Sequence, residues 1–275
     1  MPRGARALKD NVDAIEALVA VAETDDEIEQ RIGERFDILE ALTDSCIAGD
    51  SRALIVSGPA GLGKSYTVEK KLEQWDPSGV NYAITKGYVR ATGLVKLLYA
   101  YREAGQVLVF DDADAIFFDD VSLNLLKAVC DTTERRVVSW LSEGRLLDEE
   151  SGTLVPRSFE FEGTVIFISN YDFDAMIDKG HKLAPHLQAM VSRAHYLDLA
   201  MKTRRDYLVR IRQVVTQGLL SHLDLDEQVD VLTFIEAYSD RLRELSLRMA
   251  LKIASIRKTN NNGNWEKVCK VTCCK

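Results

Sequence analysis

A glycine-rich segment between an apolar run and an amphipathic helix is the feature that most constrains this chain. It reads GPAGLGKS over residues 58–65 and has the spacing G-x-x-x-x-G-K-[ST]. The run from Ala53 to Val56 precedes it, and Val68 and Leu72 follow at helical spacing. In a strand, loop and helix of this kind, backbone N–H groups and the helix N-terminus point at an anion. The segment therefore predicts a phosphate-binding loop, whereas a plain connecting turn is the alternative.

This loop predicts a nucleotide site with assigned roles for its last two residues. Lys64 is expected to reach the β- and γ-phosphates of ATP, and the hydroxyl of Ser65 is expected to bind Mg2+. The expected contact residues are Gly58, Pro59, Ala60, Gly61, Leu62, Gly63, Lys64, Ser65 and Tyr66.

Short apolar runs alternate with helical segments through the middle of the chain, and this pattern predicts an α/β fold. Such runs are typical of strands buried on both faces of a parallel sheet with crossover helices. They occupy residues 53–58, 80–84, 106–112, 164–170 and 195–199. After them come helical patterns over 203–218, 226–239 and 246–258. We expect a parallel sheet of about five strands with flanking helices, followed by a small helical lid subdomain.

The N-terminal region predicts two helices before the sheet. Apolar residues at helical spacing indicate the first over 12–22. A capping box, Thr24 to Glu27, opens the second, which carries Ile28, Ile32 and Phe36 on one face.

Composition narrows the class of protein. The 275 residues suggest about one to two domains, and the net charge of -8 disfavours general attraction to phosphate backbones. Five cysteines, an odd number with two in apolar helical patterns, argue against a disulfide scaffold, and no histidine or cysteine spacing favours zinc. The absence of a long apolar run predicts no membrane contact and a cytoplasmic protein, in the host cytoplasm if it is viral.

Two acids follow the apolar run 107–110. At the carboxyl edge of a central strand they would lie beside the phosphate loop. We expect Asp111 to hold Mg2+ through water and Asp112 to polarise the attacking water, although acids that merely end a strand are the alternative. Asp114, in the same turn, is interpreted as a solvated loop residue in preference to a catalytic one.

With these motifs, residues 45–258 resemble the AAA+ ATPase family, and the compact layout is similar to short bacteriophage proteins of DNA metabolism. The resemblance implies that Asn170 orients the lytic water and that Arg193 is an arginine finger acting in a neighbouring subunit. It also implies that Arg248 contacts the γ-phosphate from the same chain, with Arg241 and Arg243 as competitors. The alternatives are a turn asparagine at 170 and a surface arginine at 193.

One departure from the family pattern is Asp112, because most active members have Glu there. A shorter acid favours slow hydrolysis. A second departure is a long segment, 135–162, with a strand pattern on either side of residues 148–152 that predicts a hairpin. The resulting divisions are 1–44, a helical extension; 45–200, the nucleotide-binding subdomain; 201–258, the lid; and 259–275, a tail expected to be flexible.

Two segments are candidate partner contacts. The hairpin carries Arg135, Arg136, Arg145 and Arg157 together with Trp140, which suits single-stranded DNA. The alternative is that Trp140 and Phe159 pack into a subunit interface. Tyr88, beside Gly87, falls where family members have a pore loop, and an ordinary half-buried turn residue is the alternative.

The function expected from this resemblance is an ATP hydrolase that forms a homo-oligomeric ring, a hexamer by family likeness. It would remodel or translocate DNA, or else a protein partner. The alternative from another class is a nucleotide-switched loader or scaffold with little turnover. A P-loop kinase of small molecules is disfavoured by Arg193 and by the lid carrying Arg248.

Overall fold

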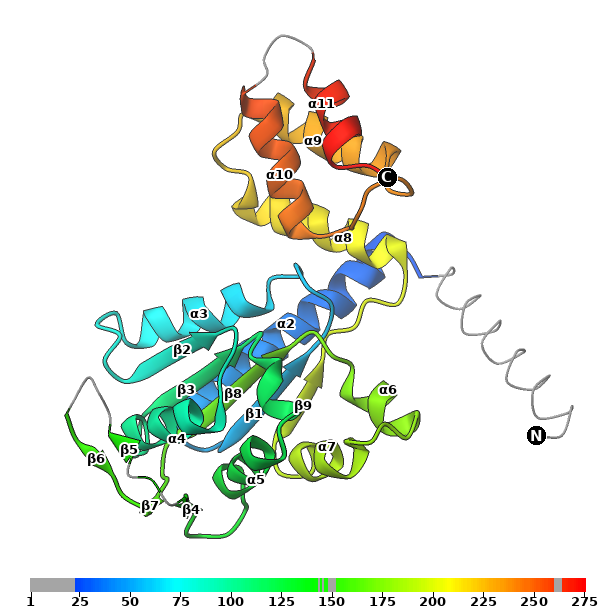
Figure 1. Ribbon diagram of the computed structural model, residues 1–275. Helices are drawn as coiled ribbons and strands as arrows, with labels where there is room; N and C mark the ends of the chain where they lie inside the picture. Colours follow the sequence, from blue (N-terminus) through cyan, green and yellow to red (C-terminus); the bar gives the residue numbers. More distant parts are fainter. Residues whose placement is uncertain (1–22, 143, 145, 148–151, 260–263) are drawn as a thin grey trace, which may run out of the picture. The chain divides into compact units, whose positions relative to one another are not determined.

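A computed structural model describes residues 23–142, 144, 146–147, 152–259 and 264–275 (Figure 1). The helix expected over 12–22 lies outside the described residues. The chain divides into two compact units. We call the one with residues 36–59 and 63–200 the α/β unit. The other, which includes residues 60–62 and Met201–Lys275, is the helical unit.

A sheet of five parallel strands forms the centre of the α/β unit, in the order β2-β3-β8-β1-β9 (Figure 1). The strands are β1 Ala53–Ser57, β2 Tyr82–Lys86, β3 Val107–Asp111, β8 Thr164–Ser169 and β9 His195–Asp198. The predicted fold class is confirmed, because each expected strand is present. β1, β3 and β8 are buried along their whole length, as the continuous apolar runs indicated.

Strand register brings three strand ends to one edge of the sheet. Ser57 pairs with Ser169, and Asp111 pairs with Ile168, so β1, β3 and β8 end at nearly the same level. Parallel strands share this edge at their carboxyl ends, and α/β proteins bind ligands there. The fold thus gathers the predicted site residues that follow these strands.

Helices of the α/β unit cover the sheet. They are α3 Lys64–Trp75, α4 Ala91–Ala100, η1 Asp114–Phe117, α5 Asp120–Val129, α6 Phe173–Asp178 and α7 Ala184–Val191. One face of the sheet presents Ile55, Phe110 and Phe167 to a core shared with α4, α5 and α7. The rings of Phe110 and Phe167 stack at 5.5 Å between centroids. Alternate strand residues thus supply a dry core beneath the site.

An antiparallel hairpin extends between α5 and β8. Its base pairs β4 Val137–Ser139 with β7 Ser158–Glu160, and farther out β5 Leu146–Leu147 pairs with β6 Leu154–Val155. These short strands lie at one side of the α/β unit in Figure 1.

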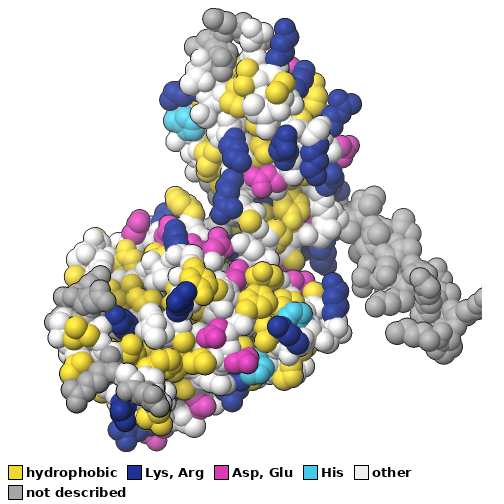
Figure 2. Space-filling view, in the orientation of Figure 1, with side chains coloured by type: hydrophobic (Ala, Val, Ile, Leu, Met, Phe, Trp, Pro, Cys, Tyr) yellow, Lys and Arg dark blue, Asp and Glu magenta, His cyan; other side chains and the backbone are white. Residues whose placement is uncertain are grey.

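The helical unit packs its helices around a core of its own. In the described residues of 201–275 these are α8 Arg204–Val214, which η2 Val215–Leu219 continues, α9 Leu225–Ala237, α10 Leu247–Thr259 and α11 Trp265–Thr272. α2 Asp25–Ala48 precedes the sheet, and Thr24 and Glu27 form the expected capping box at its start. Lys and Arg side chains lie on the face of the helical unit that Figure 2 shows.

The prediction of a flexible tail over 259–275 is wrong for residues 265–275. Trp265 is 9% exposed, Cys269 is fully buried, and Cys273 is buried beside them. The ring of Trp265 lies 5.4 Å from that of Phe234. The spacing of four from Trp265 to Cys269 to Cys273 puts one apolar stripe on a short helix. This stripe packs onto the helical unit.

Candidate functional site

Positive backbone angles shape the predicted phosphate loop between β1 and α3. Gly58 has φ +145°, and a Cβ built there would lie 3.1 Å from the backbone carbon of Leu199. Gly61 has φ +75°, and a Cβ there would lie 2.7 Å from Cβ of Ser246 in the helical unit that includes both residues. A side chain at Gly61 would therefore clash, and one at Gly58 would crowd Leu199 in a backbone conformation that favours glycine.

Lys64 is folded over the loop. Its side chain is almost fully buried, and Nζ donates to the carbonyl oxygens of Gly58 and of Pro59, the latter at 2.8 Å. A third hydrogen bond runs from Nζ to Oδ1 of Asn170, at 3.0 Å. These three oxygens are among the partners of the buried ammonium group. An anionic ligand would offer this charge a stronger partner.

Ser65 and Asp111 lie together at the start of α3. The Ser65 hydroxyl donates to Oδ1 of Asp111 at 2.8 Å, and Asp111 is 4% exposed. On the other carboxylate oxygen, Nζ of Lys86 lies at 3.5 Å. Hydroxyl and carboxylate oxygens are ligands that Mg2+ prefers. The structure brings together the two residues predicted to hold this ion.

Asp112 and Asn170 meet directly. Nδ2 of Asn170 donates to Oδ1 of Asp112 at 2.6 Å, so the Asn170 amide bridges Asp112 and Lys64. Asp112 has φ +52°, the left-handed conformation, and both residues are exposed. Asp tolerates this conformation better than most residues because its short side chain bonds locally. The turn thus favours Asp where the family resemblance has Glu.

Asp114 lies beside these residues and is less solvated than the sequence suggested. It is half-buried, and the Ser169 hydroxyl donates to its Oδ1 at 2.6 Å. Burial raises the pKa of Asp114 above its ordinary value, the Ser169 hydrogen bond opposes this, and nearby Asp112 adds to it. A polar Ser169 directly after the apolar run 165–168 was the available signal.

Arg193 lies at the opposite edge of the sheet from the loop. It precedes β9, whose first residue His195 pairs with Leu54 while its last, Asp198, pairs with Ser57. Three strand residues separate these levels by about 10 Å. The Arg193 guanidinium donates to the carbonyl of Ala189 at 2.8 Å and lies 3.9 Å from Asp131. The α/β unit therefore does not bring Arg193 to its own phosphate loop.

Arg248 is exposed in α10 and lies near loop residue Gly61 within the helical unit. Its Cγ is 3.7 Å from a Cβ built on Gly61, and the Leu247 N–H donates to the Gly61 carbonyl at 2.8 Å. The competitors Arg241 and Arg243 have backbone hydrogen bonds with the C-terminal segment. The predicted contact residue Tyr66 is 67% exposed.

One hairpin arginine, Arg136, is not part of the basic surface that the sequence suggested. Arg136 is 6% exposed, and its guanidinium donates to the carbonyls of Val129 and Gly163, both at 2.9 Å. Arg135 is exposed and pairs with Glu160 at 2.8 Å. Arg145 lies outside the described residues. The expectation that Arg136 contacts DNA is wrong, because its side chain is used inside the protein.

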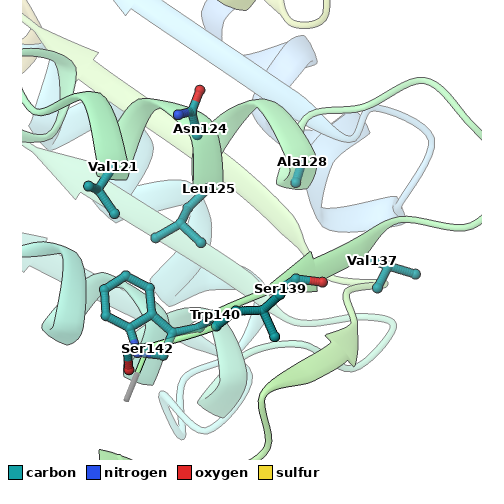
Figure 3. A pocket seen from close by; sticks show the side chains of 9 residues that line it. Val121, Asn124, Leu125, Ala128, Val137, Ser139, Trp140 and Ser142 are labelled. Atoms are coloured by element: carbon teal, nitrogen blue, oxygen red, sulfur yellow. The ribbon is translucent and has the colours of Figure 1, made fainter. Parts of the chain in front are cut away.

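The aromatic residues of the hairpin pack within the unit. Phe159 is 8% exposed and meets the ring of Tyr99 edge to face at 5.2 Å, so the alternative that it packs into a subunit interface is wrong for this residue. Trp140 is half-buried. It helps to line a cavity of about 430 Å³ between α5 and the segment that begins with β4 (Figure 3). Val121 and Leu125 line it from α5, and Val137 lines it from β4.

Tyr88 lies after β2 on an open turn. Its side chain is 74% exposed, and the Arg90 guanidinium lies 6.0 Å from the ring centroid. This exposure contradicts the alternative of a half-buried turn residue.

The cysteines, possible metal sites and possible membrane spans can now be compared with the sequence predictions. All five cysteines are free and buried, and burial raises the pKa of Cys46 and Cys130 to about 12. Within the described part of the chain, no group of three His, Cys, Asp or Glu side chains is arranged to hold a metal ion. No described helix is long and apolar enough to span a membrane.

Comparison with known proteins gives a clear relative. No protein-family model matches the chain. Over 252 residues the chain is 39% identical to an uncharacterised 36.7 kDa protein of Enterobacteria phage T4, from the nrdC-mobD intergenic region. The match covers 90% of this chain and 76% of the phage protein. The chain belongs to the same family as this phage T4 protein.

A solved structure relates the chain to AAA+ ATPases in fold. A point mutant of Thermotoga maritima RuvB has a TM-score of 0.50 and 14% identity, covering 88% of this chain and 70% of RuvB. RuvB itself is described as a Holliday junction branch migration motor. At this identity the likeness concerns the fold alone. The predicted AAA+ resemblance and fold class are confirmed.

Proposed function

We propose that this chain binds and hydrolyses Mg-ATP at the carboxyl edge of its sheet. The observation that carries this proposal is the hydrogen-bonded series Lys64–Asn170–Asp112, whose members follow three different strands. Ser65 and Asp111 lie beside it with their oxygens 2.8 Å apart. A cation, a metal-type oxygen pair, an acid and an amide are the groups that phosphoryl transfer to water uses.

Nucleotide binding would exchange the partners of Lys64. Its ammonium now donates to the Gly58 and Pro59 carbonyls and to Asn170. Phosphate oxygens would give the ammonium group acceptors that carry a negative charge, and so would add an ion-pair attraction that carbonyl and amide oxygens do not offer. The exchange would also release Asn170 from Lys64. We place the remaining loop residues and Tyr66 around the nucleotide, and Arg248 toward its γ-phosphate.

Ser65 and Asp111 fit Mg2+ by the chemistry of their oxygens and by their place next to the loop. Bound there with the nucleotide, Mg2+ would neutralise charge on the phosphates. Lys86 neutralises the other oxygen of Asp111 and so keeps this carboxylate oriented.

Hydrolysis would use Asp112 and Asn170 on the attacking water. The water oxygen forms a bond to the γ-phosphorus, the bond from that phosphorus to the bridging oxygen breaks, and ADP leaves. The Asp112 carboxylate takes the water proton. Asn170 can accept a hydrogen bond from water and donate one to a phosphate oxygen, once its contact with Asp112 opens.

Steady-state phosphate release tests this proposal. Lys64→Ala should lower turnover at least about tenfold, since a hydrogen bond to a charged group contributes about 1.5–3 kcal/mol. Lys70→Ala, on the exposed side of the same helix, is the matched control and should match the wild type. Wild-type turnover that persists in Lys64→Ala would refute the proposal.

We also propose a homo-oligomer in which Arg193 acts on the site of a neighbouring subunit. The support is its position: the sheet separates Arg193 from its own loop, and its bonds to Ala189 and Asp131 are exchangeable surface contacts. An arginine supplied in trans stabilises charge in phosphoryl transfer. A ring of six subunits follows from family likeness.

Mixing two inactive variants tests the trans role. The Arg193→Ala variant has an intact phosphate loop, and the Lys64→Ala variant has an intact Arg193. A mixture should regain a measurable fraction of wild-type turnover, because some interfaces then contain both residues. No recovery at any ratio contradicts action in trans.

For the partner we favour DNA over protein. The exposed Tyr88 next to Arg90 offers a base-stacking surface with a cation, and the hairpin retains the exposed Arg157. Single-stranded DNA should stimulate phosphate release, and Tyr88→Ala should lose the stimulation while Tyr88→Phe keeps it. Turnover that is robust but indifferent to DNA would favour a protein partner.

One observation favours the second candidate, a nucleotide-switched loader or scaffold. Oδ1 of Asp112 is already engaged by Asn170 at 2.6 Å, so the acid is held away from the role of base until that contact opens. A switch would bind ATP and turn it over slowly unless its partner is present. Burst release of one phosphate per subunit followed by near-zero turnover would support it.

A further inference from the structure

Three hydrogen bonds clamp the backbone on either side of Asn170. The Ser169 hydroxyl donates to Oδ1 of Asp114 at 2.6 Å, and the Tyr171 N–H donates to the Ser169 hydroxyl oxygen at 3.1 Å. The Ser57 hydroxyl then donates to the Tyr171 carbonyl at 2.7 Å. These contacts link the ends of β3, β8 and β1. Asn170 lies in the middle of this linked segment.

The Ser169 hydroxyl connects Asp114 to the backbone of Tyr171 through two hydrogen bonds of defined direction. Its side chain is fully buried, and a hydroxyl has one proton to donate. Because that proton goes to Asp114, the lone pairs are fixed in direction and one accepts the Tyr171 N–H. A change at Asp114 therefore reaches the backbone beyond Asn170 without any direct contact.

The turn after β3 places Asp114 for this task. Asp112 takes the left-handed conformation at φ +52°, and its N–H donates to the Ile168 carbonyl at 3.1 Å. The short helix η1 then starts at Asp114. In this way one turn directs Asp112 to the side chain of Asn170 and Asp114 to the residue before it.

We propose that Asp114 is a positioning residue: through Ser169 it holds the Asn170 segment in register with Asp112. This inference rests on the proposed ATPase function. Asp114 does not act as a second base in this account, because its carboxylate is half-buried and engaged by Ser169. In this proposal, residue 114 must supply a side-chain oxygen that accepts the Ser169 hydroxyl proton, and the negative charge of Asp114 is not required.

That distinction defines the variants. Asp114→Asn keeps an oxygen that can accept the Ser169 proton, whereas Asp114→Ala and Ser169→Ala each break the connection. We expect both alanine variants to lower kcat by about 10- to 100-fold, as small displacements of catalytic groups do. KM for ATP should stay within about twofold, because the loop and Lys64 are untouched. Asp114→Asn should retain most of the wild-type kcat.

Combining the two alanine changes gives a second signature. Because both remove the same connection, the double variant should be no slower than the slower single variant. Independent, multiplying effects in the double variant would overturn the proposal. So would an Asp114→Asn enzyme as slow as Asp114→Ala, since the charge would then be the requirement.

Amide hydrogen exchange tests the connection without turnover. The Tyr171 amide should exchange faster in Asp114→Ala and in Ser169→Ala than in wild type or in Asp114→Asn. Unchanged exchange in both alanine variants would overturn the inference. Should Asp114→Ala not fold, Ser169→Ala decides alone. If the wild type shows no Lys64-dependent turnover, the proposed function fails, and the exchange result still decides the role of Asp114.

Discussion

Two neighbouring arginines at the base of the hairpin should have very different effects on stability. Arg136 is 6% exposed and donates to the Val129 and Gly163 carbonyls, both at 2.9 Å. Its guanidinium also lies 5.2 Å from the ring centroid of Phe161. Arg136→Ala removes both donors from carbonyls that face the interior.

The size of the effect follows from these contacts. A buried polar group that loses its partner costs about 1–3 kcal/mol, so two carbonyls give about 2–6 kcal/mol of lost unfolding free energy. For a protein of this size each kcal/mol lowers the melting temperature by about 2–4 °C, which predicts a drop of roughly 4–24 °C. Urea or thermal denaturation followed by circular dichroism measures it.

Arg135→Ala is the matched control. Its side chain is 74% exposed and pairs with Glu160 at 2.8 Å, and exposed ion pairs contribute about 0–1 kcal/mol. The two variants lose the same charge from adjacent positions. Equal stability of Arg136→Ala and Arg135→Ala would refute the assignment of Arg136 to a structural role and reopen a surface role for it.

Three further predictions concern the site and the buried ionisable groups. Asp112→Asn keeps a residue that tolerates the left-handed conformation but removes the proposed general base, so kcat should fall about 100-fold or more while ATP binding is retained. Unchanged turnover would contradict the role of Asp112 as general base. Burial acts to raise the pKa of Asp206, but hydrogen bonds from a hydroxyl, a backbone N–H and an arginine lower this pKa overall, so the ionised carboxylate stabilises the fold at neutral pH and the stabilisation is lost as pH falls through the lowered pKa. Asp206→Asn should therefore lower the free energy of unfolding by about 2 kcal/mol at pH 7 and by less below about pH 4. An equal loss of stability in acid would contradict this. Burial raises the pKa of Cys46, Cys130 and Cys269 to about 12, so these thiols should resist a thiol reagent at pH 8 until the protein unfolds. Rapid labelling of any of them in the native protein would contradict their burial.

The sheet and the phosphate loop were predictable because their signals are local. A strand buried on both faces must be a short apolar run, and a loop that needs positive φ at Gly58 and Gly61 must have glycine there. The apolar run before Asp111 likewise placed the acids at the carboxyl edge. The family resemblance added Asn170, which the structure then joined to Lys64 and Asp112.

The connection from Asp114 to Ser169 was not predictable in the same way. The two residues are 55 positions apart, and they meet because Asp112 turns the chain with a positive φ. No local sequence pattern predicts a left-handed backbone conformation at an aspartate. An acid two residues beyond the Asp112 position therefore looked like part of a solvated loop.

Arg136 and the C-terminal segment show a different limit. Arg136 and Val138 are two residues apart on one strand pattern, so they share a face, and that face is buried. Positive charge suggested exposure, but two backbone carbonyls satisfy the guanidinium in the interior. In the C-terminal segment, Cys269 and Cys273 act as small apolar residues that continue the stripe of Trp265.

The central claim is that the loop and Lys64 form a nucleotide site, and nucleotide affinity tests it most directly. Titration of a fluorescent ATP analogue in the presence of Mg2+ should show saturable binding to the wild type and to Lys70→Ala. Lys64→Ala should bind about 10- to 150-fold more weakly, the range that corresponds to about 1.5–3 kcal/mol for a charged hydrogen bond. Equal affinity of Lys64→Ala and the wild type would contradict the account.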